Sequence, residues 1–127
     1  LAPNCSPALC ARVTQAATRG LRIENLGVLS YERLLTIYHS SGALIYPSKF
    51  ESFGLPLIEA NQAGLPVLAP ELDYVRDVTD PDETFDPNSP ISIANAVKRF
   101  SRTKNKKKKT FLTSSEFLSE INLDKIK

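Results

Sequence analysis

The sequence lacks several features whose absence narrows the possible classes of protein. It contains no methionine, so a native translation start is missing, and we expect an internal or C-terminal piece of something longer, or a processed chain. Its N-terminus shows no charged start followed by an apolar run, so we expect no signal peptide. No apolar stretch approaches the ~20 residues that a membrane-spanning helix needs. These features predict a cytoplasmic protein.

Residues that commonly bind metals are also scarce. The two cysteines, Cys5 and Cys10, have four residues between them, which is not the spacing of a redox or zinc motif. His39 is the only histidine, and its place at the end of a predicted helix is explained by a favourable contact with the helix dipole. We therefore expect no metal site, and free thiols as is usual in the cytosol.

The residues that are present indicate a globular chain. Its 127 residues fit one compact domain, and 42% of them are hydrophobic. The formal net charge of +2 gives the whole chain no strong bias toward anionic partners. We divide the chain into an uncertain N-terminal segment (1–20), a regularly patterned region (21–102) and a lysine-rich polar tail (103–127).

Short apolar runs and amphipathic segments alternate along the patterned region. The runs predict strands over residues 21–26, 43–47, 65–69 and 83–85. Two helices are predicted in the first part of the chain, a weak one over 8–18 and one that follows the cap residue Ser30. Three more are predicted further on, from Pro56 to just before Gly64, over 73–78, and from Pro90 to about residue 102. This alternation predicts an α/β fold, a Rossmann-like layered parallel sheet with helices on both faces.

Three of these segments have patterns that say where they pack. Two helices carry apolar stripes, formed by Tyr31, Leu34, Leu35 and Tyr38 and by Ile93, Ala96, Val97 and Phe100. The uninterrupted run at 43–47 predicts a strand covered on both faces. Because ligands of parallel sheets bind at the carboxyl ends of the strands, the loop that follows this run is a candidate site.

That loop leads into a helix start suited to phosphate. Gly54 has no Cβ, so the backbone there can turn tightly and a ligand can approach closely. We expect unpaired N–H groups near Phe53, Gly54, Leu55 and Leu57. A helix start with unpaired N–H groups is a site for phosphate.

Two carboxylates flank this predicted phosphate site. Glu51 lies before it, and Glu59 lies one turn inside the helix. A carboxylate cannot bind a diphosphate, but it accepts hydrogen bonds from sugar hydroxyls, so we expect two sugars here, the ribose of a nucleotide and a transferred sugar. A carboxylate beside the transferred sugar can also stabilise positive charge at its anomeric carbon.

The residues from 51 to 67 form a specific motif. Its members are Glu51, Phe53, Gly54, Leu55, Pro56, Glu59, Ala60, Ala63, Gly64, Pro66 and Val67. The motif resembles that of the retaining GT-B glycosyltransferases, often called glycosyl transferases group 1 (family 4). The segments Tyr46–Ser48, Leu26–Tyr31 and Phe85–Ala94 also fit the family, so the resemblance covers roughly Arg22–Phe100. It implies that 21–102 is an incomplete nucleotide-sugar donor-binding domain, the later part of a GT-B C-terminal domain.

The resemblance also implies roles for individual residues. The donor-binding residues are Glu51, Ser52, Phe53, Gly54, Leu55 and Glu59. Glu51 is the catalytic residue, which contacts the donor sugar, and Glu59 binds the ribose hydroxyls. The loop amides between them bind the distal phosphate. No metal or cofactor besides the donor substrate is implied, because the helix dipole and basic groups can take the diphosphate charge.

Other parts of the family pattern are not found. The resemblance does not extend to the family's N-terminal acceptor-binding domain, which we expect to be missing from this piece. The family's basic pair for the diphosphate cannot be placed, since only Arg12 and Arg19 are basic in residues 1–20. The nucleotide base is expected near Gly27, Val28 and Leu29. We therefore expect the isolated chain to be inactive and, at best, to bind nucleotide sugar weakly.

The implied activity is transfer of a sugar from a nucleotide diphosphate sugar to an acceptor hydroxyl with retention. The expected setting is assembly of cell-surface polysaccharide or lipopolysaccharide, with a glycan or lipid-linked acceptor. One alternative is a fragment of a sucrose- or glycogen-synthase-type enzyme with a soluble acceptor. Another is a degenerate, non-catalytic half-domain that only folds or associates.

Simpler structural interpretations stand beside these roles. Glu51 and Glu59 could be ordinary surface carboxylates, although the surrounding motif favours function. Phe53 and Leu55 could be core anchors. The residues Tyr74, Arg76 and Asp77 could approach the donor, but a solvated short helix is the favoured interpretation.

The tail contains a lysine run formed by Lys104 and Lys106–Lys109. Such runs usually behave as solvated segments. The run could instead hold the protein at anionic lipid, on the inner face of the cytoplasmic membrane, at ~1 kcal/mol per lysine near the surface. Nucleic acid is the last-ranked partner, because no aromatic residue is interleaved with the lysines.

Overall fold

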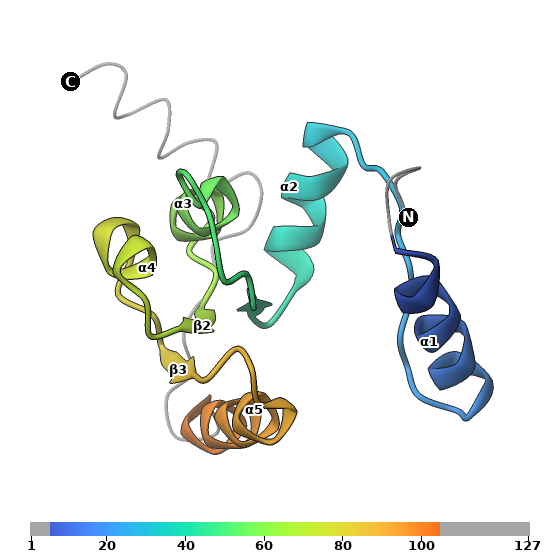
Figure 1. Ribbon diagram of the computed structural model, residues 1–127. Helices are drawn as coiled ribbons and strands as arrows, with labels where there is room; N and C mark the ends of the chain where they lie inside the picture. The colour runs from blue at the N-terminus through green and yellow to red at the C-terminus, as the bar shows by residue number, and fades with distance from the viewer. Residues whose placement is uncertain (1–5, 105–127) are drawn as a thin grey trace. The chain divides into compact units, whose positions relative to one another are not determined.

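The computed structural model describes residues 6–104, which divide into two compact units between Leu34 and Leu35. The first unit contains α1 (Pro7–Thr18), a connecting segment and the start of α2 (Tyr31–Ser40). The second unit contains the rest of α2 and every strand shown in Figure 1. Within the described residues, no helix combines the length and the apolar character that crossing a bilayer requires.

The first unit confirms one prediction and overturns another. α1 confirms the weakly helical segment, with Pro7 in its first turn. The strand predicted over 21–26 is wrong, because this stretch has no regular structure and its side chains at Leu21, Ile23 and Leu26 are exposed. Its backbone makes local turns instead of a ladder: the Ile23 N–H donates to the Leu21 carbonyl at 3.0 Å.

Ser30 caps α2 as predicted. Its Oγ accepts a hydrogen bond from the Arg33 N–H at 3.2 Å. The expected apolar stripe is only partly a core face, because Tyr38 is buried while Tyr31 is exposed. His39 lies in the last turn of α2, and Cys10 of α1 is a free thiol, whereas Cys5 lies outside the described residues.

The second unit is built on a parallel three-stranded sheet. Its strands lie in the order β1 (Leu44–Ile45), β2 (Val67–Pro70) and β3 (Glu83–Phe85). In register, Leu44 lies opposite Val67 and Leu68 lies opposite Glu83. Helices α3 (Leu55–Gln62), α4 (Asp73–Val78) and α5 (Pro90–Lys104) alternate with the strands. The α/β fold class predicted from the sequence is confirmed.

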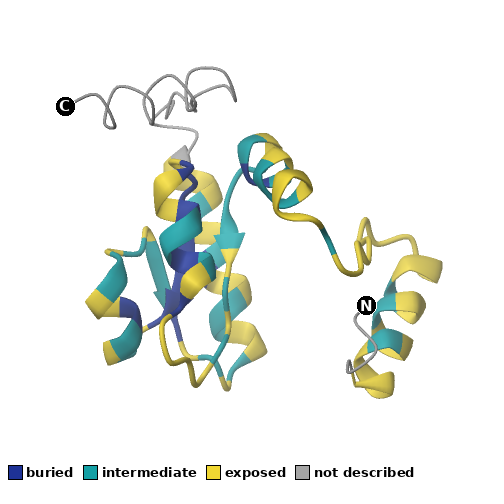
Figure 2. Cartoon of the chain, turned by 90° about the horizontal axis from the view of Figure 1, so that it is seen from above, coloured by how far each residue is buried: buried dark blue, intermediate teal, exposed yellow. Residues whose placement is uncertain are grey.

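Helices cover both faces of this sheet. In Figure 1, α3 and α4 lie on one side and α5 lies on the other. Every residue of the central strand β2 is buried, and Figure 2 shows the buried residues gathered at the centre of this unit. β1 differs from the prediction, because Ile45 is 43% exposed. β1 is an outer strand of the described sheet and pairs only with β2, so its outward side chain keeps access to solvent.

The predicted stripe on α5 is confirmed. Ala96 is buried with Leu68 and Phe85, and the other stripe residues pack against this cluster: Ile93, Val97 and Phe100. Ser89 caps the helix by accepting a hydrogen bond from the Ser92 N–H at 3.1 Å. α5 continues to Lys104, slightly beyond its predicted end. Lys106–Lys109 lie outside the described residues.

Candidate functional site

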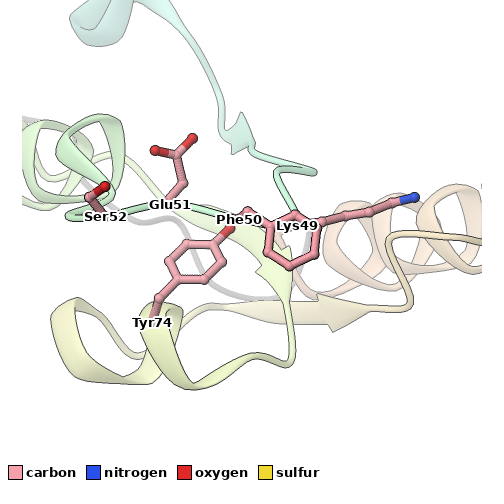
Figure 3. Close-up of a pocket in the computed structure, with 5 residues that line it drawn as sticks. All are labelled: Lys49, Phe50, Glu51, Ser52 and Tyr74. Atoms are coloured by element: carbon pink, nitrogen blue, oxygen red, sulfur yellow. The ribbon is translucent and has the colours of Figure 1, made fainter.

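Two connections meet at one edge of the sheet. The loop 48–54 follows β1 and leads into α3, and β2 leads into α4. Because the strands are parallel, both connections lie at their carboxyl ends, where such sheets bind ligands. A pocket of about 450 Å³ opens there (Figure 3). It is lined by Lys49, Phe50, Glu51 and Ser52 from the loop and by Tyr74 from α4.

The Glu51 carboxylate is held by two hydroxyl groups. Its Oε1 accepts a hydrogen bond from the Tyr46 hydroxyl at 2.5 Å and one from the Ser48 Oγ at 2.9 Å. The Tyr46 bond, and then the Ser48 bond, hold the pKa of Glu51 below its usual value. Within the described residues both bonds end on Oε1, which leaves Oε2 to accept a donor from a ligand.

Both tyrosines beside this carboxylate are neutral hydrogen-bond donors. Burial raises the pKa of Tyr46, and its hydrogen bond to Glu51 raises it further. Burial also raises the pKa of Tyr74, while the Ser48 side chain lowers it and the charge of Glu51 raises it, both to a smaller extent. The Tyr74 hydroxyl donates a hydrogen bond to the Ser48 backbone carbonyl. Both phenols therefore stay protonated at neutral pH.

Gly54 is required by the start of α3. Its φ of +60° lies in the left-handed region. A Cβ at this position would lie 3.2 Å from Leu57 Cδ1 and 3.6 Å from Tyr74 Cδ2. Within the described residues no side chain caps this helix start, so its first N–H groups face outward.

The prediction of a free N–H group at Leu57 is wrong. This group donates to the Gly54 carbonyl at 2.9 Å and closes the first turn of α3. The amides of Phe53, Gly54 and Leu55 precede that turn. The alternative in which Phe53 and Leu55 anchor the core is also wrong, because they are 72% and 60% exposed; Leu57, with no exposed surface, is the anchor.

Glu59 has a protein partner outside the pocket. It lies half-buried on α3 beside Tyr38 of α2. Burial raises the pKa of Tyr38, and the charge of Glu59 and a hydrogen bond to it add to that effect. Glu59 does not line the pocket, so its role toward ribose stays a prediction.

The residues predicted near the base belong to the first unit. The Gly27 N–H donates to Asn25 Oδ1 at 3.0 Å, and Gly27 has a φ of +64°. Val28 is exposed and Leu29 is half-buried. Gly27 borders a hollow of about 270 Å³ within this unit, between α1 and the segment 23–27. Their role in base binding stays a prediction.

Sequence reasoning missed two residues of the pocket. Lys49 and Phe50 were passed over although they belong to the same loop as Glu51. Figure 3 shows the Lys49 amine pointing away from the Glu51 carboxylate, although both residues line the pocket. The position of Lys49 and Phe50 just after a strand had already marked the whole loop as a candidate site, but nothing in the pattern singled out these two residues.

The interpretation of residues 73–78 as a solvated short helix holds only in part. The helix is confirmed, and Arg76 lies on its exposed side with ion pairs to Glu71 and Asp80, both at 2.6 Å. Tyr74, however, is half-buried and faces the pocket. The neighbouring Val75 enters the core with no exposed surface, and this fixes the helix so that Tyr74 points at the loop.

Taken together, the pocket can recognise a polyhydroxylated, anionic ligand. It supplies an ionised acceptor, an ammonium group, the Ser52 hydroxyl and an uncapped helix start nearby. Among residues 6–104, no three side chains of the metal-binding types gather at one place.

Comparisons with known proteins relate the sequence to sugar transfer. The family Glycosyl transferases group 1 matches residues 12–125. The chain is 34% identical over 90 residues to the serotype-specific mannosyltransferase WbdA of Escherichia coli. The aligned stretch covers 70% of this chain and 11% of that protein. It is 34% identical over 84 residues to the O-antigen chain mannosyltransferase B of Escherichia coli, covering 63% of this chain and 22% of that protein.

Proposed function

The chain belongs to the glycosyl transferases group 1 family, and from this membership we propose that it forms the donor site of a glycosyltransferase. The reaction is transfer of a sugar from a nucleotide diphosphate sugar to an acceptor hydroxyl, with retention at the anomeric carbon. Because the chain spans only 11% and 22% of the lengths of the two relatives, the activity of a whole enzyme is part of this proposal.

One observation carries the proposal. The Glu51 carboxylate is kept ionised by Tyr46 and Ser48 while its Oε2 remains for a ligand. An ionised acceptor oriented in this way can bind a sugar hydroxyl with a charge-assisted hydrogen bond. It can also stabilise positive charge that develops at the anomeric carbon of the transferred sugar. Glu51 is therefore the proposed catalytic residue.

The remaining parts of the donor are assigned to neighbouring groups. The amides from Phe53 to Leu55, at the start of α3, bind the distal phosphate. Lys49 supplies a positive charge at the same pocket. Glu59 binds ribose. This arrangement takes the diphosphate charge through backbone and ammonium groups, so no metal or other cofactor is part of the proposal.

The relatives suggest a sugar and a setting. Both are named as mannosyltransferases, one as serotype-specific and the other as acting on an O-antigen chain. We therefore propose mannose as the transferred sugar and a glycan or lipid-linked acceptor in cell-surface polysaccharide assembly. The corresponding location is the cytoplasm, at the inner face of the membrane.

Calorimetric titration of the chain with GDP-mannose and UDP-glucose tests the proposal. We expect saturable binding of GDP-mannose that is about tenfold weaker in Glu51→Gln, since a hydrogen bond to a charged group contributes ~1.5–3 kcal/mol. Glu71→Gln is the matched control, because Glu71 is an exposed carboxylate of the same unit that does not line the pocket. Its affinity should equal that of the unmodified chain.

The same titration separates the alternatives. Preference for UDP-glucose over GDP-mannose favours the sucrose- or glycogen-synthase-type enzyme. Absence of saturable binding to either nucleotide sugar contradicts the proposal and leaves the non-catalytic half-domain.

A further inference from the structure

Two tyrosines converge on the loop that carries Glu51. Tyr46 follows β1, and its own N–H donates to the Leu68 carbonyl of β2 at 2.9 Å. The base of this side chain is thereby fixed to the central, buried strand. The side chain reaches across to the loop, where its hydroxyl donates to Glu51 Oε1 at 2.5 Å. The sheet is in this way connected directly to the carboxylate.

Tyr74 reaches the same loop from the opposite side. Its hydroxyl donates to the Ser48 carbonyl, and its ring lies next to Gly54, 3.6 Å from the point where a Cβ would be. The Ser48 side chain donates in turn to Glu51 Oε1 at 2.9 Å. Tyr74, Ser48, Glu51 and Tyr46 therefore form one connected set of contacts.

The element that carries Tyr74 is itself firmly placed. Asn61 of α3 donates to the Val78 carbonyl at 3.1 Å and accepts a hydrogen bond from the Thr79 hydroxyl at 2.8 Å. Val75 of α4 is fully buried. The loop residues 49–53, in contrast, are all exposed. The loop is therefore ordered by contacts such as the hydrogen bonds from the Tyr46 and Tyr74 hydroxyls.

We propose that Tyr46 and Tyr74 are positioning residues for the donor site, with Tyr46 aiming Glu51 Oε2 at the ligand and Tyr74 fixing the loop around Ser48. The inference rests on the proposed function of Glu51 and assigns a task to two residues outside its motif. A carboxylate and loop that are ordered before binding lose less conformational entropy when the ligand arrives. Both hydroxyls are engaged by the loop, at Glu51 Oε1 and at the Ser48 carbonyl, so each tyrosine acts through the loop.

The test uses three variants of the chain that remove one phenolic hydroxyl each. Tyr46→Phe and Tyr74→Phe keep the ring and lose the hydrogen bond. Tyr31→Phe is the matched control, because Tyr31 is an exposed tyrosine of α2 with no contact to this loop among the described hydrogen bonds. Thermal unfolding of each variant first establishes that it folds.

A measurement without ligand comes next. Titration of the Glu51 side chain by carbon NMR should show its pKa higher in Tyr46→Phe than in the unmodified chain, because a donor to the charged form is lost. Tyr31→Phe should leave the pKa of Glu51 unchanged. A merely structural role of Tyr46 would not move this value, so an unchanged pKa in Tyr46→Phe overturns the inference for that residue.

Donor binding completes the experiment. We expect GDP-mannose to bind about tenfold more weakly to Tyr46→Phe and to Tyr74→Phe, and with unchanged affinity to Tyr31→Phe. If the unmodified chain binds GDP-mannose and the two variants bind it equally well, the positioning role is refuted while the proposed function stands. If the unmodified chain binds no donor but the pKa of Glu51 rises in Tyr46→Phe, the proposed function is refuted and the Tyr46–Glu51 contact stands.

Discussion

Glu51 couples the site to pH through its hydrogen bonds. Because its folded-state pKa is depressed, its bonds to Tyr46 and Ser48 stabilise the fold above the pKa of the unfolded chain. This stabilisation is lost as pH falls through the lower, folded-state pKa. We expect Glu51→Gln to lower the free energy of unfolding at about pH 7 and to have a smaller effect at about pH 3. Urea denaturation at both pH values measures this, and a difference that grows on acidification would contradict it.

Gly54 offers a second prediction for a single residue. Gly54→Ala should destabilise the chain by about 1–2 kcal/mol for the left-handed conformation, plus the cost of a Cβ lying 3.2 Å from Leu57 Cδ1. Gly64→Ala is the matched control, since Gly64 has a φ of +69° but no atom within 4 Å of the added Cβ. Urea denaturation should show the larger loss at Gly54.

Donor binding should separate these two glycine variants as well. Gly54 lies between the loop and the first turn of α3, whereas Gly64 lies after the end of that helix. Only Gly54→Ala should therefore weaken binding of GDP-mannose. Equal affinities and equal stability losses in the two variants would show that Gly54 has no special part in the site.

At the residue level, the motif predicted some of the residues at the pocket, whereas the others are brought there by the fold of the chain. Glu51 and Ser52 could be selected from the sequence because they stand in a recognisable string after a strand. Tyr46 fitted the family pattern at the end of a predicted strand, but its bond to Glu51 depends on how the loop folds back toward it. Tyr74 comes from another helix altogether, and no local pattern reports a contact over 26 positions.

Helix α3 holds the site through its buried face. Leu57 has no exposed surface, while Leu55 of the same helix is 60% exposed. Leu57→Ala should cost about 2–5 kcal/mol of unfolding free energy because it leaves a cavity. Leu55→Ala should cost about 0.5 kcal/mol or less, as is usual on a surface. Chemical denaturation of both variants tests this, and similar losses would mean that α3 packs differently.

Helices and strands were predictable where patterning and end signals agreed. The segment 73–78, the strand 83–85 and the α5 stripe all matched, and for α5 the predicted cap at Ser89 is also present. The predicted strand at 21–26 failed for the opposite reason. Apolar content alone suggested it, but the N–H and C=O groups of a strand need a neighbouring strand as hydrogen-bond partner. Here local hydrogen bonds to the Leu21 carbonyl and to Asn25 Oδ1 are formed instead.

For the whole chain, binding of donor should be visible as added stability. A ligand that binds only the folded state stabilises it by ~2.7 kcal/mol at a concentration of about 100 times its Kd. We therefore expect the unfolding temperature to rise with GDP-mannose concentration and to stay constant with mannose alone. A rise of equal size in Glu51→Gln would place the binding elsewhere on the molecule.

The most direct test of the donor site follows the backbone amides themselves. In a nitrogen–proton NMR titration with GDP-mannose, the signals of Phe53, Gly54 and Leu55 should shift and saturate together, and the shifts should weaken in Glu51→Gln. Signals of α5, on the other face of the sheet, should stay in place. If the amides at the start of α3 do not respond while the chain remains folded, the phosphate site is not there and the account of this loop as a donor site is wrong.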